Sequence, residues 1–363
     1  MRILEIKLKQ FLILNKSNYT VKTNRWGYIF VLPFLIVFFV FNFRPVLNTF
    51  ILSFTDMKGW QNEYRFSSDC NQCAGDKEKI CGYCKGSGKI IHAVKNYSRL
   101  ISDPFFWGSL KNTFIIWGFN FIPQLGMALV LAIWLSDTRL NLAGRGLFRA
   151  VIYLPNLLTA VSVAFLFRSI FGYGGYFNAP ANQFLRLLGI YNEVIINGES
   201  VKESINFFNS VPLSRGIVSF IQWWMWYGHT LIIFMAGIVS IPKSLYEAAL
   251  VDGANSSQIA WRITLPLLRP IMLYILITSM IGGIQMFDIP FLLTNMIGSP
   301  NYSIRTAVIY QYNTAFQGIN NYAYGAAISV GVFIITIAVA LMIFFLMQDR
   351  NDIRKKKKVR YEK

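Results

Sequence analysis

The chain has 363 residues, of which 54% are hydrophobic and 14% are charged. A typical soluble domain has about 25% charged residues, so this composition excludes a disordered chain and argues against a soluble globular enzyme. The formal net charge is +18, which in a soluble protein would suggest a nucleic-acid partner. Here the basic residues lie mostly beside long apolar stretches, so we interpret the charge as a topology signal in an integral membrane protein.

Six apolar stretches are long enough to cross a membrane as helices, which requires about 20 residues each. They lie at about residues 26–43, 112–135, 147–171, 216–241, 270–293 and 324–347. The first two contain an interior proline, Pro33 and Pro123, which a spanning helix tolerates. The sequence therefore predicts an all-α integral membrane fold with six transmembrane helices, in which residues 26–348 form the permeation domain.

Basic residues at the two ends of the chain predict its orientation. Residues 1–25 and the tail at 349–363 are both rich in Lys and Arg, and an even number of spans puts them on one side, which the positive-inside rule makes the cytoplasm. On this orientation the cytoplasmic connections are 136–146 and 242–269, and the external ones are 44–111, 172–215 and 294–323. We expect a multi-pass protein of the cell membrane with both termini in the cytoplasm.

The connection after the fourth span has a helical pattern interrupted by a glycine. It reads IPKSLYEAALVDGANSSQIAWRITLPLLRP, which predicts two short helices joined by a turn at Gly253. Leu245, Ala248, Ala249 and Ala254 would make a smooth face of small residues. Such a face fits a groove in another protein, but a plain interfacial connector explains the pattern equally well.

The same segment resembles the EAA loop of permeases of ATP-binding-cassette (ABC) importers. The residues that carry the resemblance are Glu247, Ala248, Ala249, Gly253, Leu265 and Pro266. The resemblance implies a coupling helix that inserts into a cytoplasmic ATPase dimer, with Glu247 as its main polar contact. The chain itself has no glycine-rich phosphate loop of the G-x-x-x-x-G-K-[ST] kind, so ATP would be bound by the partner subunit.

The first span, continued by Pro45, Phe50, Ser53 and Phe54, resembles the first of the two permeases in carbohydrate importers of the maltose and glycerol-phosphate type. Further segments resemble carbohydrate permeases in general. They are Trp107–Thr113, Gly146–Pro155, Phe287–Thr294 and Tyr324–Ser329, while Gly298-Ser-Pro300 stands where Gly-Gly-Pro is usual. The resemblance implies a non-enzymatic subunit that forms a heterodimer with a second permease and receives a carbohydrate from an extracytoplasmic solute-binding protein. A permease for a non-sugar solute and an integral-membrane metal-dependent enzyme are the alternatives.

A few polar side chains within the spans are candidates for the substrate path. Asn120 and Gln124 share a helix face at i and i+4, and Gln285 lies three residues before Asp288 on one side of the fifth span. Asp288 is the only acid within the six spans, and carboxylates inside a membrane are usually functional. Since Phe287-Asp288 also matches a family-wide pattern, a structural role for Asp288 is an equal alternative.

The fourth span adds one histidine and a cluster of four aromatic residues near its start. We interpret His229 as a helix-packing hydrogen-bond partner rather than a ligand. Trp223, Trp224, Trp226 and Tyr227 are typical of an aromatic belt at the membrane interface, and stacking on sugar rings is the alternative.

Residues 66–92 form a small Cys-rich insertion in the first external loop. Two Cys-x-x-Cys pairs, Cys70 with Cys73 and Cys81 with Cys84, have the spacing of a tetrahedral Zn²⁺ site. The second pair with its glycines resembles the knuckle of Hsp40-type chaperones, which implies zinc but not chaperone activity. Two disulfides are the alternative because the loop would face an oxidising side. In either case the unit would be structural, and transport would need no cofactor.

Overall fold

A computed structural model describes residues 25–59, 63, 65–69, 89–136, 144–172, 175–187, 192–196, 199–203, 206–294, 296–318 and 320–347. The chain divides into two compact units, Met1–Ile51 and Leu52–Lys363. The two basic ends lie outside the described residues, and so do the four candidate zinc ligands, Cys70, Cys73, Cys81 and Cys84.

The described part of the first unit is one long apolar helix with a change of pitch in its middle. It consists of α2 (Arg25–Phe38), a π-helical turn η1 (Phe39–Phe43) and α3 (Arg44–Leu52). The stretch Tyr28–Leu52 is 25 residues long and none of its most apolar window is buried. The helix continues past the expected end at Phe43, because Pro45 follows the π turn, where the regular hydrogen-bond ladder is already interrupted.

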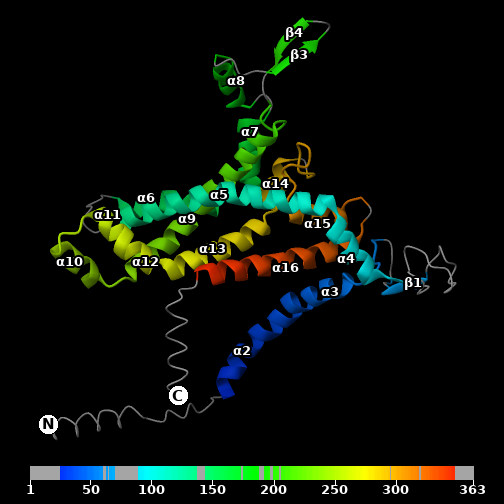
Figure 1. The fold of residues 1–363 in the computed structure, drawn as a ribbon, viewed down its shortest axis with the longest axis horizontal. Helices are drawn as coiled ribbons and strands as arrows, with labels where there is room; N and C mark the ends of the chain where they lie inside the picture. The colour runs from blue at the N-terminus through cyan, green and yellow to red at the C-terminus, as the bar shows by residue number, and fades with distance from the viewer. Residues whose placement is uncertain are drawn as a thin grey trace. The chain divides into compact units, whose positions relative to one another are not determined.

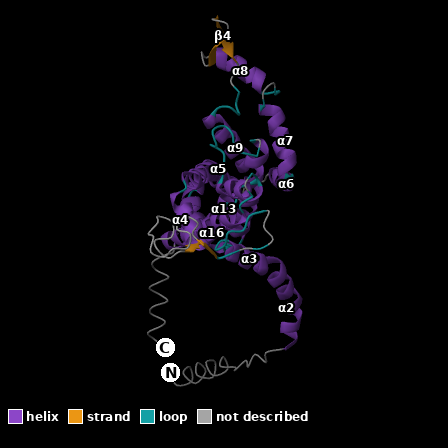
Figure 2. Ribbon diagram, turned by 90° about the vertical axis from the view of Figure 1, so that its right-hand side faces the viewer, coloured by secondary structure: helices purple, strands orange, loops and turns teal. Residues whose placement is uncertain are grey.

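The second unit is mostly helical, and Figure 2 shows that its strands are confined to short hairpins. It contains the strands β1 (Ser67–Asp69), β2 (Lys89–Ile91), β3 (Asn192–Ile196) and β4 (Glu199–Glu203), and the helices α4 (His92–Ser102), α8 (Asn178–Leu187) and α15 (Ala307–Phe316). Its remaining helices are α5 (Pro104–Ser136), α6 (Arg145–Leu157), α7 (Ala160–Phe171), α9 (Val211–Val239), α10 (Lys243–Val251), α11 (Ser256–Ile259), η2 (Ala260–Thr264), α12 (Leu265–Leu267), α13 (Arg269–Ile284), α14 (Asp288–Leu293) and α16 (Tyr322–Met347).

Among the described residues, four helices are long and apolar enough to cross a membrane, or up to six if each of two bent pairs counts as one span. The prediction of a mostly helical membrane protein is thus confirmed, with a number of spans between four and six. The expected span at 147–171 is bent by 91° between α6 and α7. Pro155 lies in the last turn of α6, and Thr159 caps α7 by accepting a hydrogen bond from the Ser162 N–H, so two helices form instead of one.

The core of the second unit is built around α5 and α9, which pack along each other and against α13. One cluster of buried side chains joins these two helices to α7 and α14, and includes Ile116, Val218 and Ile221. Gly228 lets α9 approach α6 closely, because a side chain there would meet the backbone of Ile152 and Tyr153. In Figure 1, α10 and α11 lie at one end of the long helices, and α4 and α15 lie at the other.

Candidate functional site

A cavity of about 420 Å³ lies between α5, α7, α9, α13 and the start of α14. All four polar residues that the sequence singled out line it: Asn120, Gln124, Gln285 and Asp288. They come from two segments more than 150 residues apart in sequence, so the fold brings together two pairs that the sequence identified separately.

Amide and hydroxyl groups make up most of the polar wall. The Gln124 amide Nε2 donates to the Thr230 hydroxyl at 2.7 Å, which ties α5 to α9 inside the cavity. Asn120, Gln124, Gln222 and Thr230 are all less than one-tenth exposed, although they line the cavity. Groups of this kind can replace water as hydrogen-bond partners of a hydroxylated solute.

Aromatic rings form the other part of the wall, from Trp117, Trp226 and Phe287. The Trp117 ring lies directly against Gly283, where a Cβ atom would overlap the indole, and its Nε1 donates to the Ser279 hydroxyl at 3.4 Å. Because Gly283 has no side chain, α13 leaves room for the Trp117 ring at the cavity wall, and the hydrogen bond to Ser279 fixes the ring there.

Sequence reasoning missed Trp117, Gln222, Thr230 and Ser279. Helical spacing from the residues that were identified could have found two of them. Gln222 lies seven residues before His229 and eight before Thr230 on α9, which is about two helical turns in each case.

The aromatic residues of the fourth span do not share one role. Trp224 packs in the core with its ring 5.6 Å from that of Phe167, and Trp223 stacks on Tyr227 at 5.7 Å. Trp226 faces the cavity with His229, and their rings meet edge to face at 6.2 Å. No hydrogen bond joins His229 to any residue that the structure describes, so the interpretation of His229 as a helix-packing hydrogen-bond partner stays a prediction.

The helix of the fifth span is interrupted next to the cavity. α13 ends at Ile284 and α14 begins at Asp288, and the Thr306 hydroxyl satisfies the Met286 carbonyl in the gap at 2.8 Å. Asp288 is exposed in the first turn of α14, and no described residue pairs with its carboxylate.

The loop after the fourth span folds as two short helices joined by the predicted turn. Gly253 has φ +77°, and the N–H groups of Ala254 and Gly253 donate to the carbonyls of Ala249 and Leu250 at 2.9 and 3.1 Å. These two bonds make a Schellman motif that ends α10. Asn255 and Gln258 then start α11 with reciprocal side-chain to backbone hydrogen bonds.

The exposed face of α10 differs in part from the expected one. Glu247, Ala248 and Leu245 are exposed, but Ala249 is buried, so the small residues do not form one surface. The Tyr246 and Thr264 hydroxyls are 3.2 Å apart, which links α10 to η2. Leu265 and Pro266 begin α12 and lead the chain into α13.

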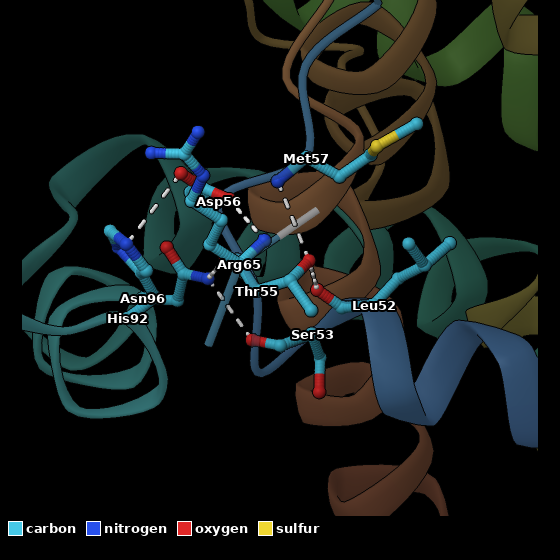
Figure 3. A network of polar contacts seen from close by, with 8 residues as sticks. All are labelled: Leu52, Ser53, Thr55, Asp56, Met57, Arg65, His92 and Asn96. Carbon is cyan, nitrogen blue, oxygen red and sulfur yellow. Dashed lines mark hydrogen bonds and ion pairs between the residues drawn. The ribbon is translucent and has the colours of Figure 1, made fainter. Parts of the chain in front are cut away.

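Polar contacts join the residues on either side of the Cys-rich insertion (Figure 3). β1 and β2 pair antiparallel on either side of it. The Asp56 carboxylate accepts from the Arg65 N–H at 2.8 Å and lies 3.6 Å from His92 Nε2, and the Asn96 amide donates to the Thr55 carbonyl at 2.9 Å. Burial lowers the pKa of His92, and Lys95 adds to this, while Asp56 acts in the opposite direction.

The predicted zinc site gains no support from the structure. Its four ligands, Cys70, Cys73, Cys81 and Cys84, all lie outside the described residues, so neither a tetrahedral cluster of thiolates nor a pair of disulfides is shown. Within the part of the chain that the structure describes, no group of three or more His, Cys, Asp or Glu side chains could hold a metal ion. The choice of Cys70, Cys73, Cys81 and Cys84 as metal ligands therefore stays a prediction from their spacing.

A buried acid at the start of α5 connects this helix to α15 and α16. The Asp103 carboxylate accepts hydrogen bonds from the Tyr310 and Tyr324 hydroxyls, both at 2.5 Å. Burial raises the pKa of Asp103, but hydrogen bonds from these hydroxyls and from backbone N–H groups outweigh burial, so the pKa is lowered. Burial and the bond to Asp103 raise the pKa of Tyr310 to about 12. The Arg305 guanidinium lies over the Tyr310 ring.

Residues 124–354 match the family model described as "Binding-protein-dependent transport system inner membrane component". The chain belongs to this family. It is a multi-pass permease of the cell membrane, and since the family consists of transport components, the prediction that the chain is not an enzyme is confirmed.

The permease is similar to several curated transport proteins over most of its length. It is 28% identical to the lactose transport system permease protein LacF of Rhizobium radiobacter, over 90% of this chain and 95% of that protein. It is 28% identical to the arabinooligosaccharides transport system permease protein AraP of Bacillus subtilis (strain 168), over 87% and 86% of the two chains. It is 26% identical to the trehalose/maltose transport system permease protein MalF of Thermococcus litoralis, over 93% and 98%.

A solved structure has the same fold. It is a chain of a bacterial ABC transporter involved in the import of the acidic polysaccharide alginate, with a TM-score of 0.66, 21% identity, and coverage of 90% of this permease and 96% of that chain. A second structure of a bacterial alginate ABC transporter, in complex with a pentasaccharide-bound periplasmic protein, matches with a TM-score of 0.62. The predicted resemblance to importer permeases is confirmed by these matches and by the family.

Proposed function

We propose that this permease carries a carbohydrate across the membrane, and that the solute passes through the cavity between α5, α9 and α13. The observation that carries the proposal is the wall of that cavity, which combines buried amides with the side chains of Trp117 and Trp226. Sugars present hydroxyl groups at their edges and C–H groups on their faces, and this wall offers a partner for each. The lactose, arabinooligosaccharide and trehalose/maltose permeases to which the chain is similar support the same solute class.

Four residues would contact the solute within the cavity. Asn120 and Gln124 offer amide donors and acceptors from α5. Gln285 offers an amide from the break before α14, and Asp288 offers carboxylate acceptors from the first residue of α14. A solute hydroxyl that leaves water without such partners would lose about 2–7 kcal/mol of hydrogen-bonding free energy.

Replacing Gln124 by Leu tests this path. Gln124→Leu removes the amide and the bond to Thr230, so we expect ATP-driven sugar uptake to fall at least about tenfold, which corresponds to about 1.4 kcal/mol. The matched control is Gln183→Leu, an exposed glutamine on α8 outside the cavity, which should leave uptake unchanged. Equal uptake by both variants at equal amounts of inserted protein would refute the path.

Coupling to ATP would come from the loop helices. In our proposal α10 inserts into a cleft of a cytoplasmic ATPase dimer, and Glu247 makes its main polar contact. A second permease completes the transmembrane dimer, and an extracytoplasmic binding protein delivers the sugar. Closure of the ATPase dimer would then move α10 and open the cavity to alternate sides by rigid-body rotation of packed helices.

The exposed position of Glu247 gives a direct test. Glu247→Lys reverses a charge without disturbing a packed side chain, so we expect the protein to insert normally but to lose most ATPase co-purification and ATP-driven uptake. Glu63→Lys, which makes the same change at another exposed position, should behave like the unchanged protein. Full ATPase association in Glu247→Lys would rule out the coupling role.

We also propose an orientation in the membrane, the limits of the domains and a metal site. Residues 1–25 and 349–363 would be cytoplasmic, residues 26–348 would form the transmembrane domain, and residues 66–92 would be an external unit that holds zinc.

Metal analysis of the purified protein tests the zinc unit. In the proposal Cys70, Cys73, Cys81 and Cys84 together bind one ion, because four thiolates complete the tetrahedral coordination that Zn²⁺ prefers. One equivalent of zinc in the unchanged protein, and none in Cys81→Ser, would support the site. If the protein holds no metal and its cysteines do not react with thiol reagents, the cysteines form disulfides instead.

A further inference from the structure

The charge of the cavity wall is unbalanced. Among the residues that line it, Asp288 is the one carboxylate, and none is a lysine or an arginine. No described residue neutralises the Asp288 carboxylate.

Two arginines near the external end of the long helices are engaged elsewhere. The Arg215 guanidinium donates to the Asn112 side-chain carbonyl at 2.6 Å and to the Ser303 carbonyl at 3.1 Å. Arg305 is 9% exposed, and its Nε donates to the Ser109 hydroxyl at 3.1 Å. Neither lines the cavity, so these arginines do not offset Asp288 within its wall.

An unpaired carboxylate between apolar helices acts on any charged solute beside it. Repulsion between like charges grows as water is excluded from the space between them, because the local dielectric constant falls. The amides and hydroxyls of the wall bond neutral hydroxyl groups but supply no compensating positive charge. A solute with a carboxylate or phosphate group would therefore meet a net unfavourable field.

We propose that this cavity selects against anionic carbohydrates, that the transported sugar carries no carboxylate or phosphate group, and that Asp288 sets this preference. The inference rests on the proposed role of the cavity as the solute path. The similarity in fold to an importer of acidic alginate does not bear on it, because 21% identity shows the fold alone.

The reaction rates of charged thiol reagents report the electrostatic field in the cavity, and this test does not require the sugar to be identified. Thr278 is exposed and lines the cavity, so Thr278→Cys places a thiol there within the complete transporter. We expect a cationic methanethiosulfonate to modify it at least about tenfold faster than an anionic one, each rate being divided by the reagent's rate with a small free thiol. The chain without the introduced cysteine gives the background from the four native cysteines.

Removing the charge identifies its source. Asp288→Asn combined with Thr278→Cys should bring the two rates to within about twofold of each other, because the amide has nearly the same shape but no charge. Glu63→Gln in the same background is the matched control: it removes one negative charge outside the cavity and should leave the ratio unchanged. A ratio near one in the parent, or a ratio that Asp288→Asn does not alter, overturns the inference.

Uptake after modification separates this inference from the proposed function. If modified Thr278→Cys no longer transports sugar but the rate ratio is near one, the cavity is the path and the charge selection is wrong. If the ratio of the two rates is as expected but modification leaves uptake unchanged, the cavity has the expected negative field but is not the solute path. In that case the proposed function is wrong.

Discussion

Asp103 connects parts of the second unit that lie far apart in the sequence. Its two hydroxyl partners, Tyr310 and Tyr324, are 207 and 221 residues further along the chain. Its other oxygen accepts from the Phe105 N–H at 2.9 Å, which caps the start of α5. Sequence reasoning did not identify this cluster, because Asp103 lies outside every apolar stretch and nothing local predicts partners at such a separation. In contrast, Asn120 and Gln124 were found because helical spacing alone puts them on one face.

Tyr324→Phe removes one of the two hydroxyl donors to Asp103. Because Tyr324 is fully buried and hydrogen bonds to charged groups contribute more than neutral ones, we expect the free energy of unfolding to fall by about 1–3 kcal/mol. Thermal unfolding of the purified permease in one detergent measures this loss. Tyr274→Phe, at a tyrosine that is 56% exposed on α13, is the control. Equal stability of the two variants would contradict a stabilising role for the cluster.

His92 makes the base of the insertion sensitive to pH. The pKa of His92 in the folded chain lies below its ordinary value of 6.5, so the unfolded chain binds a proton first as the pH falls. Stability should therefore decrease as the pH falls through about 6.5, and level off below the folded pKa. The measurement is the difference in melting temperature between pH 7.5 and 5.5, which His92→Gln should reduce. His229→Gln replaces the other histidine of the chain, and a reduction by that variant alone would contradict the assignment.

At the scale of elements, the sequence predicted where helices form better than where a helix is interrupted. The loop at 242–269 was predicted as two helices around Gly253, since a glycine between two helical patterns has a clear conformational meaning. The 91° bend between α6 and α7 was not predicted. Pro155 alone does not break a spanning helix, as the continuous helix through Pro123 shows. The bend forms where Pro155 is followed by Thr159, a polar residue that can start a new helix.

Gly253→Ala tests the turn between α10 and α11. The residue has φ +77°, a conformation that costs a residue with a side chain about 1–2 kcal/mol. Nothing lies within 4 Å of a Cβ atom at this position, so the penalty comes from the backbone and not from crowding. We expect α11 to change direction, and ATPase co-purification to fall while the amount of inserted permease stays the same.

Gly216→Ala is the matched control for the turn. It also has open space around a Cβ atom, but lies in the helix α9 with an ordinary φ. If both alanine variants retain the same ATPase association, the left-handed turn is not needed for coupling.

At the scale of the whole molecule, the orientation in the membrane carries the functional argument, because the loop helices can meet an ATPase only in the cytoplasm. Two exposed positions on either side of α9 report it: Tyr176, which is 90% exposed after α7, and Val251, which is 89% exposed at the end of α10. α9 has 29 residues, and at about 1.5 Å per residue it is about 43 Å long, which is enough to cross a bilayer. The two positions should therefore lie on opposite sides.

Labelling of single introduced cysteines with a membrane-impermeant maleimide reads out these sides. We expect Tyr176→Cys to react in intact cells, and Val251→Cys to react only in inverted membrane vesicles, each above the background of the unchanged chain. Both cysteines are placed at exposed positions, so a difference in reactivity reports the side of the membrane and not burial. If Val251→Cys reacts in intact cells, α10 faces outward, Glu247 cannot touch a cytoplasmic ATPase, and the proposed coupling mechanism is wrong even if the cavity carries the sugar.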